Sequence, residues 1–531
     1  MKRIIFIVSI ALFSFSVFSQ QKTKLAEIQW GQQFKIGKRF VFFDIITIDE
    51  QNNIHVLYKQ YSGFMGLNAK FHVAKISSDL KYSPYKELNL EVEGNPNQLM
   101  DIVEIGGNVY VFSSFENTKT KETKMYLHHY NVKTQTVSDG REIAKLSWEG
   151  FKRRHSGSFH ITYSYDRNSV LVYYDLPYEE GKNEKFGAII FNNQMEILWR
   201  NEFVLPYNDE MFHIEDVYLG DNAEIFIIGK KFLETDSRKK RDPRYYNYVL
   251  LSTSDQGNDL TQHDIMLKDY YISQLTAAMN PNNDIICSGF ITEKQKSSSI
   301  AGVFYILIDD KTKEIEIETV KPFDFDFIIQ DMSEKQQKKT QKKAEKGKDI
   351  ELPYFEFRDI VVKENGGAMI TAEKFYIKVV TRTDPRTGAT STTTYYYYQD
   401  IIVIDFNPEG ELNYAIKIPK RQYSTDDGGF WSSYVMGVHE DKVHFIYNDN
   451  TLNINKKSGP QASVQTRGKK NISAVLVTIF PDGEWNKELL YNYKEAGYNL
   501  APKYSMQLSA NEVLLYCNSK GVNKFGIVEF K

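Results

Sequence analysis

The 531-residue chain has the composition of a globular protein, with 41% hydrophobic residues, 25% charged residues and a formal net charge of −3. This balance excludes an intrinsically disordered chain, and it argues against nucleic-acid binding, which calls for a basic surface. Two cysteines, Cys287 and Cys517, are too few for a disulfide framework and predict buried free thiols. Aromatic residues make up 14% of the chain and favour strands, because flat rings pack well on pleated sheets.

The first 19 residues have the pattern of a secretory signal peptide. Lys2 and Arg3 form a basic start, and residues 4–18 form an apolar stretch too short to span a bilayer comfortably. We expect cleavage after Ser19, which leaves a mature domain of residues 20–531 that is exported to the periplasm or secreted. No later apolar run is long enough for a membrane helix, so the sequence predicts no transmembrane segment.

A polar turn followed by a short apolar run recurs about eight times along the chain. The apolar runs begin at Ile54, Val109, Val170, Ile225, Ile285, Ala368, Val443 and Val513. Further strand candidates stand before and after each run, separated by turn residues such as Asn, Asp and Gly. The pattern therefore predicts eight copies of one four-stranded antiparallel unit.

Only seven candidates for a fourth strand exist among the eight units, because the last unit ends at Lys531. Residues 25–36 form an unassigned strand near the mature N-terminus. The economical solution is a ring in which this strand completes the last sheet. We therefore predict an all-β fold, a single eight-bladed β-propeller closed by its N-terminal strand, with seven blades as the alternative.

Long insertions fall on one face of the predicted disc. In an antiparallel meander, the loop between the second and third strands and the connection between blades leave the same face. The insertions that use these sites are residues 233–244, which contain Arg238, Lys239, Lys240 and Arg241, and residues 329–351, 376–399 and 448–471. One face is therefore expected to be elaborated and the other plain.

Residues 329–351 have the pattern of a charged helical insertion. Asp331 is a candidate for the N-cap, and Gly347 suits the C-terminal end. The segment has almost no apolar stripe and sets lysines one turn apart. It is either a solvated arm or a basic handle for an acidic partner.

Polar residues occupy one repeat position in the predicted first strands, which are the innermost strands of a propeller. Asp44, Asp101, Asp216 and Asp359 stand there, and His160 takes the same position in the third unit. A ring of carboxylates around the channel would suit Ca²⁺ or another hard cation, or an acid/base pair. The alternative is a repeated structural device in which each carboxylate accepts backbone N–H groups of its own blade.

Four consecutive tyrosines, residues 395–398, lead into the third strand of the sixth unit. Side chains alternate along a strand, so Tyr395 and Tyr397 share one side of the hairpin. These rings either pack along the hairpin or form an exposed patch that binds a protein or a sugar.

No motif of a known catalytic chemistry occurs. The sequence lacks a GxSxG elbow, a P-loop, a GxGxxG turn between strand and helix, and the HExxH or CxxC spacings of zinc sites. No cofactor is indicated beyond a cation in the channel. An enzyme acting on a polysaccharide or peptide at the channel mouth, through the four aspartates, is the second hypothesis.

The run YYYYQDIIVIDFNPEGELNYAIKIPKRQ at residues 395–422 resembles a passage in uncharacterised exported, β-propeller-like proteins of Bacteroidota-type bacteria. The resemblance implies a cell-envelope setting and a repeated β architecture, and it brings no activity. The first hypothesis is accordingly a binding scaffold of the cell envelope. Its elaborated face would hold an envelope protein or a glycan.

Overall fold

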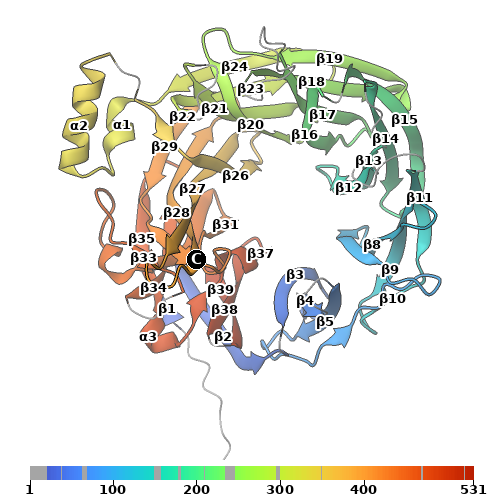
Figure 1. Ribbon diagram of the computed structural model, residues 1–531, viewed down its shortest axis with the longest axis horizontal. Helices are drawn as coiled ribbons and strands as arrows, with labels where there is room; N and C mark the ends of the chain where they lie inside the picture. The colour runs from blue at the N-terminus through green and yellow to red at the C-terminus, as the bar shows by residue number, and fades with distance from the viewer. Residues whose placement is uncertain are drawn as a thin grey trace, which may run out of the picture.

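The computed structural model describes residues 21–37, 39–62, 68–148, 157–176, 181–208, 210–233, 245–294, 299–347, 350–467, 471–519 and 521–531. Its strands form four-stranded antiparallel units arranged radially around a central axis (Figure 1). The predicted eight-bladed β-propeller is therefore confirmed. Each unit is a blade. In blades one to seven the strands run in chain order from the axis to the rim, and in blade eight the N-terminal strand takes the rim position (Figure 1).

Blades one to four follow one another without interruption of this order. Their strands are β3 (Phe40–Ile48), β4 (Ile54–Ser62), β5 (Asn68–Ile76) and β6 (Lys86–Glu87); β7 (Gln98–Ile105), β8 (Asn108–Asn117), β9 (Glu122–Asn131) and β11 (Arg141–Ser147); β12 (Ser158–Tyr163), β13 (Ser169–Asp175), β14 (Asn183–Asn192) and β15 (Ile197–Asn208); and β16 (Phe212–Leu219), β17 (Ile225–Phe232), β18 (Tyr246–Ser254) and β19 (Asp259–Ile265).

Blades five to eight carry the larger insertions. Their strands are β20 (Tyr271–Met279), β21 (Ile285–Thr292), β23 (Gly302–Ile308) and β24 (Ile315–Pro322); β26 (Phe355–Val362), β27 (Ala368–Thr383), β28 (Thr390–Phe406) and β29 (Leu412–Ile418); β31 (Val435–His439), β32 (Lys442–Asn450), β34 (Ile472–Ile479) and β35 (Trp485–Asn492); and β37 (Met506–Ser509), β38 (Glu512–Ser519), β39 (Val522–Phe530) and β2 (Ala26–Lys35).

Short elements decorate the blades. They are β1 (Gln21–Lys22), β10 (Thr136–Val137), β22 (Ser299–Ile300), β25 (Leu352–Pro353), β30 (Gln422–Thr425), β33 (Val464–Gln465), β36 (Asn499–Leu500), helix α3 (Tyr493–Ala496), and 3₁₀ turns at Asp255–Gly257, Thr451–Asn453 and Pro502–Tyr504. No helix of the described residues is long and apolar enough to cross a bilayer.

The N-terminal strand closes the ring. β2 pairs antiparallel with β39, from Ala26 opposite Phe530 to Lys35 opposite Val522, and forms the rim of blade eight. Because β2 lies in blade eight and precedes β3 of blade one in the chain, this pairing links the first blade to the last. The strand pairing therefore joins the two ends of the chain in one sheet, as predicted.

The hydrophobic core is divided among the interfaces between blades. Eight clusters of buried side chains are present among the described residues, and each joins two neighbouring blades. The cluster that closes the circle packs Phe42 and Tyr58 of blade one against Tyr516 and Phe525 of blade eight. The two cysteines are buried free thiols, as expected.

The charged insertion between blades five and six holds two helices, α1 (Phe325–Ile329) and α2 (Glu334–Ala344), at the rim of the disc (Figure 1). None of the residues of α2 is buried. The expectation that Asp331 caps this helix is wrong. The helix begins at Glu334 because Ser333 and Gln336 form a reciprocal capping box, which satisfies the first free N–H groups.

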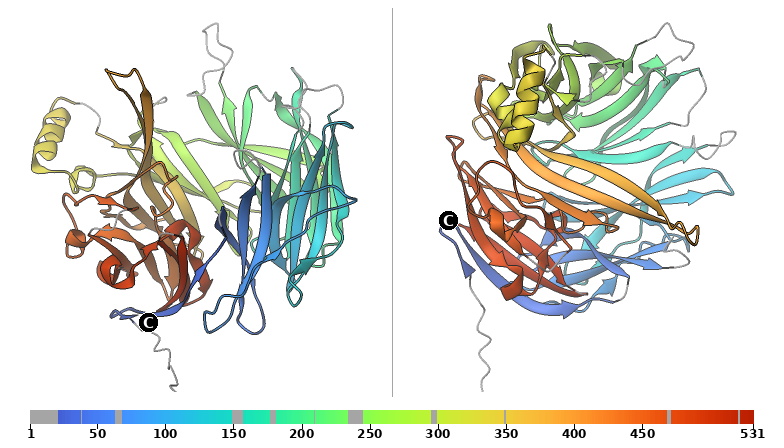
Figure 2. Two further views of the ribbon diagram at one scale, coloured as in Figure 1. Left: turned by 60° about the horizontal axis from the view of Figure 1, so that its bottom comes forward. Right: turned by 60° about the vertical axis from the view of Figure 1, so that its left-hand side comes forward.

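The hairpin of β27 and β28 is the longest in the molecule and extends well beyond its blade (Figure 2). β26 pairs with β27 only as far as Lys374, opposite Phe355. Beyond that point β27 pairs, among the described residues, with β28 alone, up to Thr383 opposite Thr390. On the other edge of the hairpin, β28 pairs with β30 over residues 395–398. The outer part of β27 thus has a free edge.

Candidate functional site

The four aspartates of the repeat position each follow a β-bulge. The register of the first strand shifts immediately before Asp44, Asp101, Asp216 and Asp359, which leaves one extra residue in the strand. In the first three, Oδ1 accepts the N–H of the next residue at 2.8–2.9 Å. A bulge leaves a backbone group without a ladder partner, and these carboxylates supply the missing acceptor.

The second carboxylate oxygen is also occupied in three of the four. Tyr163 of blade three donates to Asp101 at 2.7 Å, and Thr371 and Tyr434 donate to Asp359 at 3.3 and 3.5 Å. Tyr218 donates to Asp216 at 2.7 Å. These hydrogen bonds join residues within and between blades near the axis.

Asp44 and Asp101 are the two aspartates that influence one another. Desolvation raises the pKa of Asp44, and the Asp101 carboxylate adds to the rise, while the Ile45 N–H opposes it. His160 instead contacts its own blade. Its Nε2 lies 2.8 Å from Ser158 Oγ and 3.7 Å from Asp175 Oδ2, and its ring stacks on Tyr173. Within the described residues, no three histidine, cysteine or carboxylate side chains gather as a metal site requires.

The tyrosines of the long hairpin form a stack on one side. The rings of Tyr376 and Tyr397 are parallel within 15° at a centroid distance of 4.6 Å. Tyr354 extends the stack beyond Tyr376, and Tyr395 and Tyr423 lie 6.3 Å from Tyr397. Tyr395 and Tyr397 thus share a side, as the alternation predicts, and both stay partly accessible to solvent.

A basic pocket of about 440 Å³ adjoins this stack. Tyr376, Tyr397 and Tyr423 line it together with Lys378 and Arg421, and no carboxylate of the described residues does. The other predicted basic patch, Arg238, Lys239, Lys240 and Arg241, lies outside the described residues.

The opposite side of the hairpin exposes aliphatic groups. Ile377 is 52% exposed and Val379 is 61% exposed. They stand on the part of β27 that has no second partner strand among the described residues. A free strand edge with exposed apolar side chains is uncommon, because natural proteins normally protect such edges.

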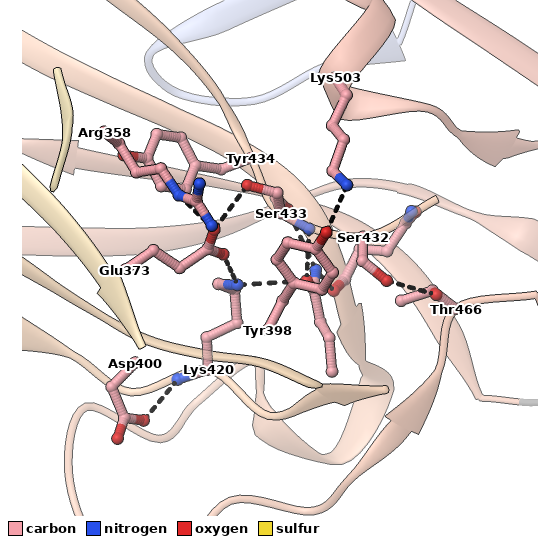
Figure 3. Close-up of polar contacts among 12 residues, drawn as sticks. Arg358, Glu373, Tyr398, Asp400, Lys420, Ser432, Ser433, Tyr434, Thr466 and Lys503 are labelled. Atoms are coloured by element: carbon pink, nitrogen blue, oxygen red, sulfur yellow. Dashed lines mark hydrogen bonds and ion pairs between the residues drawn. The ribbon is translucent and has the colours of Figure 1, made fainter. Parts of the chain in front are cut away.

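A network of buried charges fixes the base of this hairpin (Figure 3). Glu373 of β27 has no exposed surface and accepts hydrogen bonds from Lys420, Arg358 and Ser433. Lys420, also fully buried, donates a second bond to Gln422 at 3.1 Å. A buried ion pair is tolerated only with such full satisfaction of its hydrogen bonds.

The same network holds the loop between blades six and seven. Gln422 accepts from the Ser433 N–H and donates to the carbonyl oxygens of Ser433 and Asn448. Ser432 bonds Thr466 at 2.9 Å. This loop carries Phe430 and Trp431 across to blade one, where both pack at the cluster that closes the ring.

Lys503 lies at the edge of the network and points to the hydroxyl of Tyr398 (Figure 3). Its ammonium also lies 4.3 Å from the centre of the Tyr398 ring. Burial lowers the pKa of Lys503 to about 8 and raises that of Tyr398 to about 12. The base of the hairpin therefore lies beside an amine that loses its proton more readily than an ordinary lysine does.

The sequence analysis did not find the Glu373 network. Its one signal is a lone acidic residue in the apolar run A-M-I-T-A-E of a second strand. At that position of the neighbouring repeat stands Phe290, which is also fully buried. The other six repeats carry polar residues at this position, so the repeat pattern by itself does not single out Glu373 as a buried charge: they are Lys59, Ser114, Asp175, Lys230, Asn448 and Asn518.

No family model matches the sequence, and no curated protein matches it. Solved structures with similar folds include the Dos1 propeller (9% identity, 94% of each chain covered, TM-score 0.40). The WD40 domain of SCAP from fission yeast shares 10% identity over 96% of this chain and 97% of that one, with a TM-score of 0.39.

The β-propeller domain of the Trilobed protease from Pyrococcus furiosus shares 10% identity over 86% of this chain and 99% of that domain, with a TM-score of 0.36. At these identities the likeness concerns the fold alone, and the chain is in this sense similar to β-propellers.

Proposed function

We propose that the protein is an exported scaffold that binds a partner protein through the long hairpin of blade six. The observation that carries the proposal is the free edge of β27, which presents unpaired backbone groups beside Ile377 and Val379. An extended segment of a partner can add to such an edge as a further strand, and its backbone hydrogen bonds then supply affinity.

The two sides of the hairpin supply selectivity for that segment. Alternate side chains of an added strand point to opposite sides of the sheet. On one side they meet the exposed aliphatic groups of Ile377 and Val379, and on the other the tyrosine stack with Lys378 and Arg421. A segment that alternates apolar and acidic residues complements both sides.

The cell envelope is the proposed setting. The basic and then apolar character of residues 1–19 supports export, and the resemblance of residues 395–422 to exported proteins of Bacteroidota-type bacteria supports an envelope partner. The outer part of the hairpin contributes to none of the eight interfaces between blades. The stability of the propeller therefore does not depend on it, and its surface can serve binding.

The first test shortens the hairpin. Ile377 and Tyr396 are cross-strand partners, so replacing residues 378–395 by Asn-Gly leaves a two-residue turn that joins them. We expect this variant to lose partner capture, with thermal unfolding shifted by no more than about 4 °C, roughly the effect of 1 kcal/mol. Unchanged capture by the shortened protein would count against the proposal.

A single substitution tests the edge itself. Val379→Lys places a charge on the free edge and should block strand addition without unfolding the protein, as edge lysines do in natural sheets. Val204→Lys is the matched control, since Val204 is a 56% exposed valine on an outer strand of blade three. Capture measured with a photo-crosslinker at Ile377 should fall for Val379→Lys alone. A crosslink to glycan instead of protein would replace the protein partner by a sugar polymer.

A further inference from the structure

A second concave site lies on the seam that closes the ring, away from the hairpin. It is a pocket of about 420 Å³ between blade eight and blade one, within the range of about 300–1,000 Å³ typical of small-molecule sites. Phe40, Phe42, Phe430, Trp431 and Tyr516 give it aromatic walls. These rings come from three separate parts of the chain, and the buried charge network holds the loop that supplies two of them.

Two buried hydrogen-bond donors belong to residues that line this pocket and have no partner within the part of the chain that the structure describes. Asn523 has no exposed surface, and its Oδ1 accepts from the Tyr516 hydroxyl and the Asn518 amide, both at 2.6 Å. Its Nδ2 meets no acceptor among the described residues, and neither does the buried Nε1 of Trp431. Leaving such a buried donor unpaired costs about 1–3 kcal/mol, so native proteins normally satisfy it.

The charge that the described lining residues bring to this pocket is positive. Arg39 lines it, and no aspartate or glutamate of the described residues does. Arg39 adopts a left-handed backbone conformation (φ 67°) and makes no ion pair within the part of the chain that the structure describes. The site thus offers donors and a cation to a ligand that brings acceptors and a negative charge.

We propose that this pocket binds a carboxylate attached to an aromatic or aliphatic body. Asn523 Nδ2 and Trp431 Nε1 satisfy acceptor oxygens of the ligand, and Arg39 compensates its charge. The aromatic walls cover the apolar body and remove it from water. A cationic ligand finds no counter-charge here, and a ligand without acceptors leaves both donors unpaired.

Two sources share this chemistry: a free organic acid and the C-terminal residue of a peptide. Sodium phenylacetate represents the first and N-acetyl-Ala-Ala-Phe the second. Phenylacetamide and the C-terminal amide of the same peptide are the matched neutral probes. In calorimetric titrations of the intact protein, each carboxylate that binds should bind at least about tenfold more tightly than its amide.

The comparison of probes decides both the chemistry and the source. Tighter binding of the peptide assigns the site to protein C-termini, and tighter binding of phenylacetate assigns it to free acids; both outcomes support the carboxylate site. Equal binding of acids and amides overturns the proposal, as does the absence of saturable binding by all four probes.

Substitution of Asn523 tests the donor directly. Asn523→Asp keeps the oxygen that accepts from Tyr516 and Asn518, and it replaces the free donor by a negative oxygen. We expect at least about a tenfold loss of phenylacetate affinity. If this variant fails to fold, Trp431→Phe keeps an aromatic ring, removes Nε1–H together with part of the indole surface, and should weaken binding several-fold. Retained wild-type affinity in a folded variant contradicts the assignment.

Two further variants separate this site from the hairpin. Arg39→Asn removes the charge at a backbone conformation that asparagine tolerates, and it should reduce both affinity and its dependence on salt. Lys378→Ala changes the basic pocket of the hairpin and should leave phenylacetate binding unchanged. A loss with Lys378→Ala equal to that with Arg39→Asn would place the probe at the wrong pocket and overturn the proposal.

Discussion

Blades five and six are neighbours with the same strand order, and one buried position of the second strand is apolar in blade five and charged in blade six. In blade five this position is Phe290, which stacks on Phe357 at a centroid distance of 4.3 Å. In blade six it is Glu373, which accepts hydrogen bonds from Lys420, Arg358 and Ser433. Both side chains are completely buried.

The two solutions stabilise the sheet in different ways. Burial of Phe290 is favourable by about 1.5–3 kcal/mol and is non-directional. The Glu373 pair gains little net stability over an apolar substitute, but its hydrogen bonds are directional and specify where the loop with Phe430 and Trp431 must lie. Glu373 and its partners lie at the base of the long hairpin and beside the loop that lines the seam pocket. These hydrogen bonds therefore position the base of the hairpin and this loop more than they add stability.

Removing the charge of Glu373 should have the largest effect on stability. Glu373→Gln keeps the shape and leaves the Lys420 ammonium buried without its counter-charge, so we expect a loss of about 3–5 kcal/mol in the free energy of unfolding. Phe290→Leu, the matched change in blade five, should cost about 1 kcal/mol. Denaturant unfolding of both variants measures the difference.

A double variant sharpens this test. Glu373→Leu combined with Lys420→Met removes both charges, so the stability should return to within about 1–2 kcal/mol of the parent, while phenylacetate binding at the seam pocket falls because the loop is less well positioned. Equal losses for Glu373→Gln and Phe290→Leu would show that the two positions are energetically alike.

The adjacent repeat position gives a smaller, steric contrast. Blade five has Gly289 where blade six has Ala372, and a Cβ on Gly289 would lie 2.1 Å from the carbonyl oxygen of Gln274. We expect Gly289→Ala to destabilise by about 1–3 kcal/mol through this clash. Ala372→Gly should cost about 0.5–1 kcal/mol, mainly through backbone entropy. Thermal unfolding of the pair checks the order, which would be reversed if blade five simply shifted to accept the methyl group.

The sequence was sufficient for the fold because the signal repeats. Strands β4, β17, β21 and β27 begin at the predicted starts of the apolar runs, and the pairing of β2 with β39 follows from the missing fourth strand. Eight weak indications of one unit reinforce one another, and the closure of the ring determines which strand completes the eighth blade.

The sites were less accessible because they depend on contacts between distant segments. The shared repeat position of Asp44, Asp101, Asp216 and Asp359 was visible, but the β-bulge before each is a feature of register that composition does not encode. Glu373 meets Lys420 only when the hairpin folds back on its blade. The seam pocket combines residues from both ends of the chain with the loop after blade six, so no local pattern announces it.

The smallest effect concerns the protonation of Lys503, at the edge of the charged region. Its folded pKa of about 8 lies below the ordinary value of 10.5. Between these pH values the folded protein holds fewer protons at this site than the unfolded chain does. The contribution of Lys503 to stability therefore rises as the pH rises through that window.

The same shift predicts an unusual chemical reactivity. Only the neutral amine attacks an acylating reagent, so acetylation of Lys503 should rise with a midpoint near pH 8. Mass spectrometry of peptides from protein briefly treated with N-hydroxysuccinimidyl acetate at a series of pH values measures this midpoint. Tyr398→Phe removes the hydroxyl that accepts from the ammonium and should lower the midpoint of Lys503 further, since the charged form loses a partner while its burial persists. A midpoint near the ordinary lysine value of 10.5 would mean that the surroundings of Lys503 are well hydrated, and that the network ends before it reaches this residue.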